Sequence, residues 1–346
     1  MSVINLLVIG SRDVTKVRDG ISVYVDEVFS KFNLNSYSVT SVLVADQRKI
    51  RKRRNLVEVL IKVNMKGILE KIEYCVKIAT FLTRKSTKNY DVFVLQGLSV
   101  AWLSPFIKFF FNNSKLVIVH HSAEHLNESI SFWKRYIANL ALFFSKSCDY
   151  SVAVSNYILT AINGSDIIRN GASFPIYKNG KIKSNQSLLF IGRLVEEKGI
   201  IDLAMKLNKM ASKINLVCIS PVIDKKMREK LVNIYKNIVF FEALSKSEIF
   251  EHIAKCKLVV IPSFNEGFSL VSQEALNCGR LPLQRDLPAL REFKCPDSSY
   301  FNDENFEERF LAMWENSETT VAPITSRRGW NEVRLEWEEL LERVRL

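Results

Sequence analysis

The stretch LFIGRLVEEKG, residues 189–199, joins a buried strand to a helix through a glycine turn. Working outward from it, short apolar runs alternate along the chain with longer helical patterns. Nine of these runs are predicted strands: 3–9, 38–44, 91–96, 115–120, 150–154, 187–192, 214–219, 237–241 and 257–262. Such alternation is typical of parallel sheets wrapped by helices. The sequence therefore predicts an α/β fold with two Rossmann-like doubly wound domains facing a central cleft.

The predicted domain boundaries follow from length and composition. The chain has 346 residues with 47% hydrophobic and 25% charged side chains, which excludes a disordered or fibrous protein. A polar stretch at 170–185 indicates a linker, so we expect one domain at 1–170 and a second at 171–326. Residues 327–346 carry apolar side chains at helical spacing and predict a final amphipathic helix that packs on another part of the protein. The six cysteines are widely spaced and are expected to be free thiols.

Positive charge is concentrated in the first half of the chain. The net charge is +12, and residues 46–88 alone hold 13 basic and 4 acidic side chains. The run that opens this segment is Arg48, Lys49, Arg51, Lys52, Arg53 and Arg54. A basic amphipathic helix is expected after it, with Ile68, Ile72, Cys75, Ala79 and Leu82 on its apolar side. This charge suits an anionic membrane surface or an acceptor; a solvated loop beside an ordinary core helix is the other interpretation.

Two further classes are excluded at this stage. No nucleic-acid-binding motif accompanies the basic run, so we expect no nucleic-acid partner. The first ten residues lack a basic region and a cleavage site, and lysine or arginine interrupts the longest apolar stretches. We therefore expect a cytoplasmic protein, located at the inner face of the cell membrane through its basic half.

The 189–199 segment is suited to a diphosphate. Gly192 permits a tight turn, Arg193 can bind phosphate oxygens with two hydrogen bonds, and Lys198 adds a point charge. The positive end of the following helix favours an anion as well.

A second strand–loop–helix segment, LVVIPSFNEGFSLVSQEALNCG, spans residues 258–279. Glu266 lies in its loop and Glu274 in its helix. The backbone N–H groups of Gly267, Phe268, Ser269 and Leu270 are expected at the helix N-terminus, where they can bind anions and hydroxyls. The carboxylate behind them is placed to accept hydrogen bonds from a vicinal diol such as that of ribose.

Taken together, the two segments resemble the retaining glycosyltransferases of the GT-B fold, in particular glycosyltransferase family 4 (glycosyl transferases group 1). The pattern is G-R-x4-K-G followed by P-S-x2-E-G-F-x6-E-A. Gly20–Ser22 resemble the family's glycine loop. The segments VAVS at 152–155 and RNG at 169–171 resemble its interdomain region. The tryptophan-containing C-terminal helix resembles the family's helix that crosses back to the N-terminal domain.

The resemblance implies a role for each matching residue. Arg193 and Lys198 would neutralise the nucleoside diphosphate, Glu274 would bind the ribose, and Glu266 with the amides of 267–270 would hold the donor sugar. Gly20 and Gly192 would line the donor site. A histidine after an N-domain strand would contact the sugar near its reacting carbon; His121 is favoured by spacing, and His120 stays open.

Metal dependence is not expected, because the sequence has no Asp-x-Asp pair to hold a metal-bound diphosphate. His120, His121, Glu124 and His125 are grouped closely enough to be considered as metal ligands. Adjacent strand residues point to opposite faces, which argues against that cluster. We expect no metal and no cofactor beyond the nucleotide sugar substrate.

The sequence departs from the family pattern at three glycine positions, which hold Asp19, Ser220 and Glu242. The predicted activity is a metal-independent, retaining transfer of a sugar to a lipid-linked saccharide in bacterial surface polysaccharide biosynthesis, such as that of lipopolysaccharide or capsule. An epimerase or phosphorylase of GT-B fold is a second enzyme hypothesis. A non-catalytic module that binds nucleotide sugars or polyanions is the alternative from another class.

Overall fold

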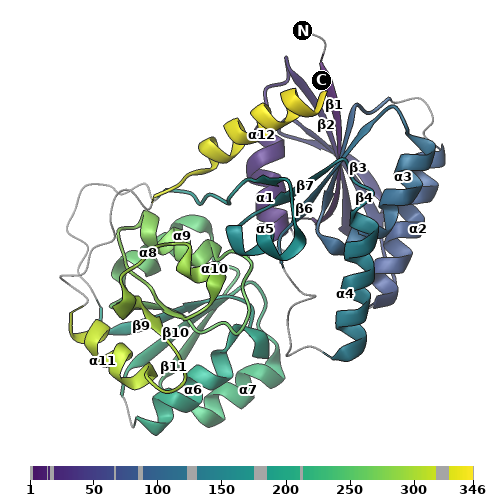
Figure 1. The fold of residues 1–346 in the computed structure, drawn as a ribbon. Helices are drawn as coiled ribbons and strands as arrows, with labels where there is room; N and C mark the ends of the chain where they lie inside the picture. The colour runs from purple at the N-terminus through teal and green to yellow at the C-terminus, as the bar shows by residue number, and fades with distance from the viewer. Residues whose placement is uncertain are drawn as a thin grey trace. The chain divides into compact units, whose positions relative to one another are not determined.

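A computed structural model describes residues 3–13, 15, 19–65, 68–84, 89–122, 131–174, 185–210, 213–316 and 327–345. The chain divides into two compact units. Unit 1 comprises Met1–Asn170 and Trp330–Leu346, and unit 2 comprises Gly171–Gly329. Each unit is built on one sheet with helices packed against it (Figure 1). The predicted fold class of two Rossmann-like domains is therefore confirmed.

The sheet of unit 1 has the strand order β3-β4-β2-β1-β5-β6-β7-β8. The strands are β1 (Ile4–Arg12), β2 (Tyr37–Ala45), β3 (Lys49–Arg53), β4 (Leu56–Lys62), β5 (Val92–Gln96), β6 (Lys115–His120), β7 (Tyr150–Ala153) and β8 (Asp166–Ile167). All neighbouring pairs are parallel except β3 and β4. The order reverses between β1 and β5, which is where open α/β sheets bind ligands at the carboxyl ends of their strands.

The basic run forms the edge strand β3, which the sequence did not predict. Arg51 and Arg53 reach across to the buried Glu58 of β4 at 2.5 and 2.9 Å. Arg51 also pairs with Asp13 at 2.6 Å, and Arg53 with Asp26 at 2.6 Å. Part of this positive charge is thus neutralised by ion pairs that hold an edge strand.

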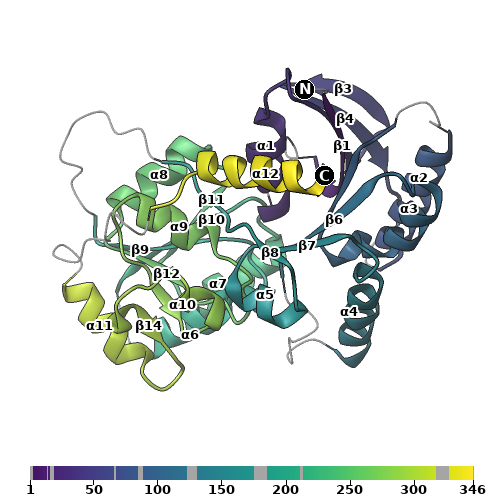
Figure 2. The same cartoon turned by 45° about the horizontal axis from the view of Figure 1, so that its top comes forward.

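Helices cover both faces of the unit 1 sheet. They are α1 (Gly20–Val28), α2 (Ile68–Arg84), α3 (Ser104–Phe110), α4 (Phe132–Ser145) and α5 (Asn156–Ile162), with a 3₁₀ segment at Leu98–Leu103. In Figures 1 and 2, α2, α3 and α4 lie on the same side of the unit. The predicted helix α2 is present, but Tyr74, Ile78 and Leu82 form its buried face while Ile72 is 56% exposed. The expected inward position of Ile72 is therefore wrong.

The C-terminal helix α12 (Trp330–Arg345) belongs to unit 1 although unit 2 precedes it in sequence. It lies beside α1 in Figures 1 and 2. Trp337 is fully buried and its Nε1 donates a hydrogen bond of 2.5 Å to the Tyr24 hydroxyl. Its ring also packs on Phe29 with a centroid distance of 5.0 Å. The predicted return of this helix to the N-terminal domain is confirmed.

Unit 2 has the parallel strand order β11-β10-β9-β12-β13-β14, the order of a dinucleotide-binding sheet. Its strands are β9 (Ser187–Ile191), β10 (Asn215–Ser220), β11 (Ile238–Glu242), β12 (Leu258–Ile261), β13 (Leu283–Arg285) and β14 (Tyr300–Phe301). Its helices are α6 (Ile200–Lys209), α7 (Lys225–Ile234), α8 (Lys246–Lys255), α9 (Leu270–Asn277), α10 (Pro288–Arg291) and α11 (Phe306–Glu315). Apolar clusters pack on both faces of the sheet.

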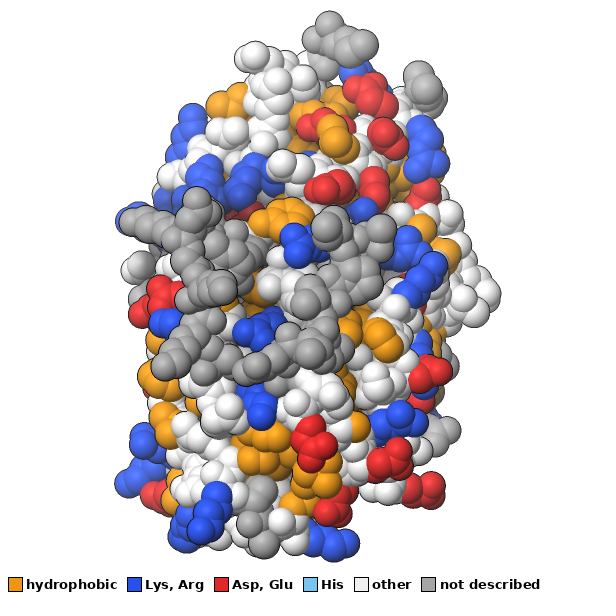
Figure 3. Space-filling view, turned by 90° about the vertical axis from the view of Figure 1, so that its left-hand side faces the viewer, with side chains coloured by type: hydrophobic (Ala, Val, Ile, Leu, Met, Phe, Trp, Pro, Cys, Tyr) orange, Lys and Arg blue, Asp and Glu red, His pale blue; other side chains and the backbone are white. Residues whose placement is uncertain are grey.

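The surface drawn in Figure 3 has hydrophobic side chains in small groups among basic and acidic ones. Across the described part of the chain, no helix is both long enough and apolar enough to span a bilayer.

Candidate functional site at the switch point of unit 2

The two predicted motifs meet where the strand order of unit 2 reverses. Strands β9 and β12 are neighbours, and their carboxyl ends lead into the loops 192–199 and 262–269. Strand order reverses between β9 and β12, and open α/β sheets bind ligands at the carboxyl ends of the strands at such a switch point. Except for Gly20, the residues expected to bind the donor, from Gly192 to Lys198 and from Glu266 to Glu274, follow these two strands.

Lys198 and Glu266 make the central contact of this site. The Lys198 Nζ lies 2.7 Å from Glu266 Oε1, and the Ser263 hydroxyl donates to the same oxygen at 2.7 Å. The two charged side chains are only 22% and 11% exposed, so the ion pair is largely shielded from solvent. A lysine and a glutamate 68 residues apart are thus held together by the fold.

Backbone contacts fasten the two loops directly. Gly199 has φ +69°, and a Cβ at this position would lie 2.0 Å from the Pro262 carbonyl oxygen. Only glycine permits this approach. The Phe264 N–H also donates to the Glu197 carbonyl oxygen at 2.9 Å. The position of Lys198 relative to the 262–269 loop is therefore fixed by main chain on both sides.

Arg193 and Glu274 lie in different surroundings. Arg193 is 57% exposed and its guanidinium donates to Glu197 at 2.7 Å. An exposed pair of this kind is weak, so the guanidinium can exchange Glu197 for a phosphate at low cost. Glu274 is nearly buried in α9, and its Oε1 accepts a hydrogen bond from Lys246 Nζ at 2.9 Å.

Lys246 is a site residue that the sequence analysis missed. It is the first residue of α8, directly after the Ser245 N-cap, whose side chain and that of Glu248 form a capping box. The available signal was the Ser-x-x-Glu pattern shortly after the predicted strand 237–241, which places a lysine at the carboxyl edge of the sheet. Its partner 28 residues away could not be read from that pattern.

The N-terminus of α9 faces the same loop. Ser269 is its N-cap and accepts a hydrogen bond from the Ser272 N–H at 3.1 Å. Phe268 packs on Phe293 with ring centroids 5.0 Å apart, which anchors the backbone of 267–269. The positive end of the helix macrodipole thus adds to the charge of the nearby lysines and favours an anionic ligand.

Arg285 is a second residue that the sequence analysis did not predict, and it contacts the 262–264 loop. Its side chain is 8% exposed and bonds to Asp202 and Asp303 at 2.8 and 2.9 Å. Its Nε donates to the Pro262 carbonyl at 3.2 Å, and its guanidinium lies 4.2 Å from the Phe264 ring centroid. The arginine thus links β13 and α6 to the loop that carries Glu266.

Unit 1 presents the predicted histidines at the end of β6. His120, the last residue of the strand, is 1% exposed, whereas His121 is partly buried. The His121 Nε2 lies 2.7 Å from Gln96 Oε1, and its ring packs edge-on against Tyr24 at 5.1 Å. Burial, with a smaller contribution from His120, lowers the pKa of His121 to about 3, so its imidazole is neutral at physiological pH.

Glycine and aspartate shape the neighbouring turns of unit 1. Gly10 lies at the register shift in β1 with φ +111°, and a Cβ there would lie 2.8 Å from the Gln96 carbonyl oxygen, so this position requires glycine. Gly20 opens α1, and Asp19, where the family pattern has glycine, is its N-cap: the carboxylate accepts from the Ser22 N–H at 2.8 Å. The departure at Asp19 thus caps a helix.

The other predicted residues lie neither at the switch point of unit 2 nor beside His121 at the end of β6. The basic run is at the β3 edge of the unit 1 sheet, separated from β6 by β4, β2, β1 and β5. Within it Arg48, Lys49, Lys52 and Arg54 are exposed, while Arg51 and Arg53 are half-buried in ion pairs. Of the histidine cluster considered as a metal site, Glu124 and His125 lie outside the described residues; among those described, no group of three metal-ligating side chains is found.

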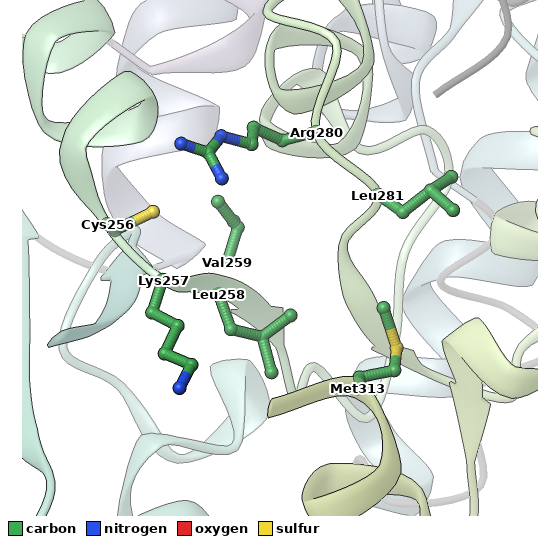
Figure 4. A pocket seen from close by; sticks show the side chains of 7 residues that line it. All are labelled: Cys256, Lys257, Leu258, Val259, Arg280, Leu281 and Met313. Carbon is green, nitrogen blue, oxygen red and sulfur yellow. The ribbon is translucent and has the colours of Figure 1, made fainter. Parts of the chain in front are cut away.

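A small pocket in unit 2 does not coincide with the motifs. Figure 4 shows its lining side chains around the start of β12, among them Lys257, Arg280 and Met313. Arg280 donates to the Ala254 carbonyl at 2.5 Å. The pocket lies at the amino end of the strand, whereas ligands of open α/β sheets bind at the carboxyl ends.

Comparison with known proteins agrees with this geometry. Residues 185–308 match the family model described as Glycosyl transferases group 1. A protein of Methanocaldococcus jannaschii, described as an uncharacterized glycosyltransferase, is 27% identical over 182 residues. This match covers 48% of the present chain and spans about half, 49%, of that relative's length.

Solved structures resemble the chain over nearly its full length. Sucrose-phosphate synthase from Thermosynechococcus elongatus has a TM-score of 0.80 at 14% identity, covering 99% of both chains. The catalytic domain of starch synthase IV from Arabidopsis thaliana, bound to ADP and acarbose, has a TM-score of 0.68 at 12% identity, covering 100% of both. At such identities the likeness shows the fold alone. The chain therefore has the GT-B fold, and its residues 185–308 match the Glycosyl transferases group 1 family model.

Proposed function

We propose that this protein is a retaining, metal-independent glycosyltransferase. It would move a sugar from a nucleotide diphosphate sugar to a lipid-linked saccharide in bacterial surface polysaccharide biosynthesis. The observation that carries the proposal is the Lys198–Glu266 contact at the switch point of unit 2, with Arg193 and the α9 N-terminus on the same loops. That the similar starch synthase structure holds ADP supports a nucleoside diphosphate here.

The charges of the site suit a departing diphosphate. In the transfer, the bond between the anomeric carbon and the β-phosphate oxygen breaks, and negative charge grows on that oxygen. Lys198 and Arg193 would stabilise this charge electrostatically, together with the N–H groups at the start of α9. The bond between the anomeric carbon and the acceptor oxygen forms on the same face, and the acceptor's proton passes to the departing phosphate oxygen.

The two carboxylates would hold hydroxyl groups. Glu274 is oriented by Lys246 and would accept hydrogen bonds from the ribose diol, while Glu266 is oriented by Lys198 and Ser263 and would accept bonds from the sugar. His121 is the favoured histidine for the donor sugar, because it is more accessible than His120 and is held by Gln96. As a neutral imidazole it would act through a hydrogen bond.

Donor binding is tested by thermal stabilisation of the full chain with a panel of nucleoside diphosphates and their sugars, with and without chelator. We expect one nucleotide to raise the melting temperature equally in both conditions. Lys198→Ala and Glu274→Ala should abolish the shift, whereas the matched surface variants Lys255→Ala and Glu251→Ala, which remove an exposed ion pair on α8, should keep it. If no nucleotide shifts the melting temperature, the proposed donor site is wrong.

Transfer itself separates the proposal from its alternatives. We expect the protein to release nucleoside diphosphate and to form a glycoside whose anomeric configuration is that of the donor. NMR of the reaction mixture measures both. An epimerase would change the donor without an acceptor, and a phosphorylase would require phosphate. Nucleotide binding with no turnover on any saccharide acceptor would favour the non-catalytic binding module.

A further inference from the structure

The most exposed aromatic side chains of the described residues lie on neighbouring helices of unit 1. They are Phe109 (78%) and Phe110 (56%) of α3, and Phe132 (66%), Trp133 (70%), Tyr136 (53%) and Phe143 (64%) of α4. Soluble proteins seldom leave so many large aromatic rings exposed, because keeping apolar surface in contact with water is unfavourable in free energy.

Helix α4 leaves four large aromatic side chains exposed, whereas its small residues, with the half-buried Leu142 and Phe144, pack inward. Phe132, Tyr136 and Phe143 are spaced by four and seven residues, so they share one face of the helix. Trp133 flanks them and packs on Phe132 and Tyr136 with ring centroids 5.8 and 6.4 Å away. The buried face consists of Ala138, Ala141 and Ser145. The aromatic residues, here named the α4 stripe (Phe132, Trp133, Tyr136, Phe143), are therefore not needed to attach the helix to the core.

Basic side chains predominate around the α4 stripe, where the one described acidic neighbour, Asp149, is paired with Lys108 of α3 at 2.7 Å. Neither α3 nor α4 contains Asp or Glu, whereas α4 carries Lys134 and Arg135, and Lys146 follows it. Lys134 and Lys146 are exposed, and residues 1–170 as a whole hold 23 basic against 13 acidic side chains. An outward aromatic face with cationic flanks is typical of helices that lie in the interface of an anionic membrane.

We propose that the α4 stripe docks unit 1 on the surface of an anionic lipid bilayer, with α4 parallel to the membrane plane. This rests on the proposed function, since a lipid-linked acceptor lies in a membrane. The rings would enter the headgroup region while the lysines contact lipid phosphates. The basic strand β3 fits this role less well, because Arg51 and Arg53 are held in ion pairs with Asp13, Asp26 and Glu58.

The test is co-sedimentation of the full chain with vesicles of phosphatidylcholine containing about 30% phosphatidylglycerol, compared with pure phosphatidylcholine. We expect binding to the anionic vesicles and a loss of about tenfold or more in the variant Phe132→Ser/Trp133→Ser/Phe143→Ser. The control Leu34→Ser/Met205→Ser/Val222→Ser removes three exposed apolar side chains elsewhere and should bind like the wild type. Brominated lipid should quench tryptophan fluorescence in the wild type and much less in Trp133→Phe.

The outcomes separate this inference from the proposed function. The stripe variant should keep its nucleotide-induced thermal shift and its transfer to a water-soluble acceptor, because the stripe does not include any donor-site residue. Equal vesicle binding by the stripe variant and the wild type would overturn the inference. So would a wild-type dimer that the stripe variant converts to monomer, because the stripe would then bind a second copy. Failure of nucleotide binding with intact vesicle binding would overturn the proposed function alone.

Discussion

At the scale of single residues, both carboxylates of the candidate donor site have a lysine partner. Glu266 is paired with Lys198 and Glu274 with Lys246. Each pair is only partly exposed, so the lysine offsets part of the desolvation cost of the nearly buried carboxylate. A bound diphosphate would compete with the two carboxylates for hydrogen bonds from these lysines. The carboxylate oxygens would then be free to accept hydrogen bonds from hydroxyl groups of the ligand.

The pH dependence of stability is expected to include His121. Its pKa is lowered from 6.5 to about 3 in the folded state, so between these values the unfolded chain binds more protons. Stability is then fully present above pH 6.5 and falls as the pH drops through this window. His121→Gln, which can still bond to Gln96, should weaken this acid sensitivity. Urea unfolding near pH 7 and near pH 5 checks it; identical pH dependence in both proteins would contradict the prediction.

Glu58 is expected to be important for stability although it is far from the candidate site. It is 1% exposed and holds two arginines of the edge strand. Glu58→Gln should lower the free energy of unfolding by about 2–3 kcal/mol, because Arg51 and Arg53 lose a charged partner. The exposed neighbour Lys52 is the control, and Lys52→Ala should change the free energy by less than about 0.5 kcal/mol. Chemical denaturation measures both.

At the scale of elements, the loops after β9 and β12 act as one unit because main chain meets main chain at Gly199 and Pro262. The loop after β12 is supported from the other side by Arg285, which also bonds to Asp202 of α6. The candidate site therefore depends on the ends of three strands, β9, β12 and β13. A change in the loop after β9 should disturb residues of the loop after β12, and the reverse.

Gly199→Ala is expected to damage both stability and nucleotide binding. The added Cβ would meet the Pro262 carbonyl at 2.0 Å, so the two loops must separate. Gly97→Ala is the matched control: its φ is +85°, but the nearest atom to a Cβ is 3.8 Å away, so only backbone strain of about 1–2 kcal/mol is added. We expect a larger loss of melting temperature for Gly199→Ala, and loss of the nucleotide-induced shift for this variant alone. Equal shifts in both variants would contradict the contact.

At the scale of the whole molecule, unit 1 is completed by a helix that follows unit 2 in the sequence. The buried side chains of α12 join the core of unit 1; they are Trp330, Val333, Trp337, Leu340 and Val344. Arg334 of the same helix donates a hydrogen bond to the Glu27 carbonyl of α1 at 2.9 Å. Unit 2 is continuous in sequence between the two parts of unit 1. The folding of unit 1 is therefore expected to require residues that follow unit 2 in the sequence.

Trp337→Ala should show how much unit 1 depends on this helix. The side chain is fully buried against Phe29 and Tyr24, so its removal should cost about 3–5 kcal/mol. Leu335 lies on the same helix and is 60% exposed, so Leu335→Ala should have little effect. Calorimetry of the full chain measures both variants. A small loss in Trp337→Ala would mean that α12 contributes little to unit 1.

Local sequence pattern was sufficient for much of this fold. Apolar runs predicted the strands β1, β2, β5, β6, β7, β9, β10, β11 and β12. Apart from the edge strand β11, most of these are central, and a strand buried on both faces is apolar throughout. The same reading missed β3 and β4, where arginines and Glu58 interrupt the apolar pattern. Of these two only β3 is an edge strand, and its arginines also pair with Asp13 and Asp26, which lie 38 and 27 residues away and outside any local window.

The sequence by itself determined the two Rossmann-like sheets and the two loops where chemistry is expected, because glycine, charge and strand–helix periodicity are local properties. Only the tertiary structure decided which side chains meet there. Lys246 reaches Glu274 and Arg285 reaches Pro262 because strand order brings their elements together, and order is set by packing of the whole sheet. The outward face of α4 was decided in the same way, since its alanines are buried while Phe132, Trp133, Tyr136 and Phe143 stay exposed.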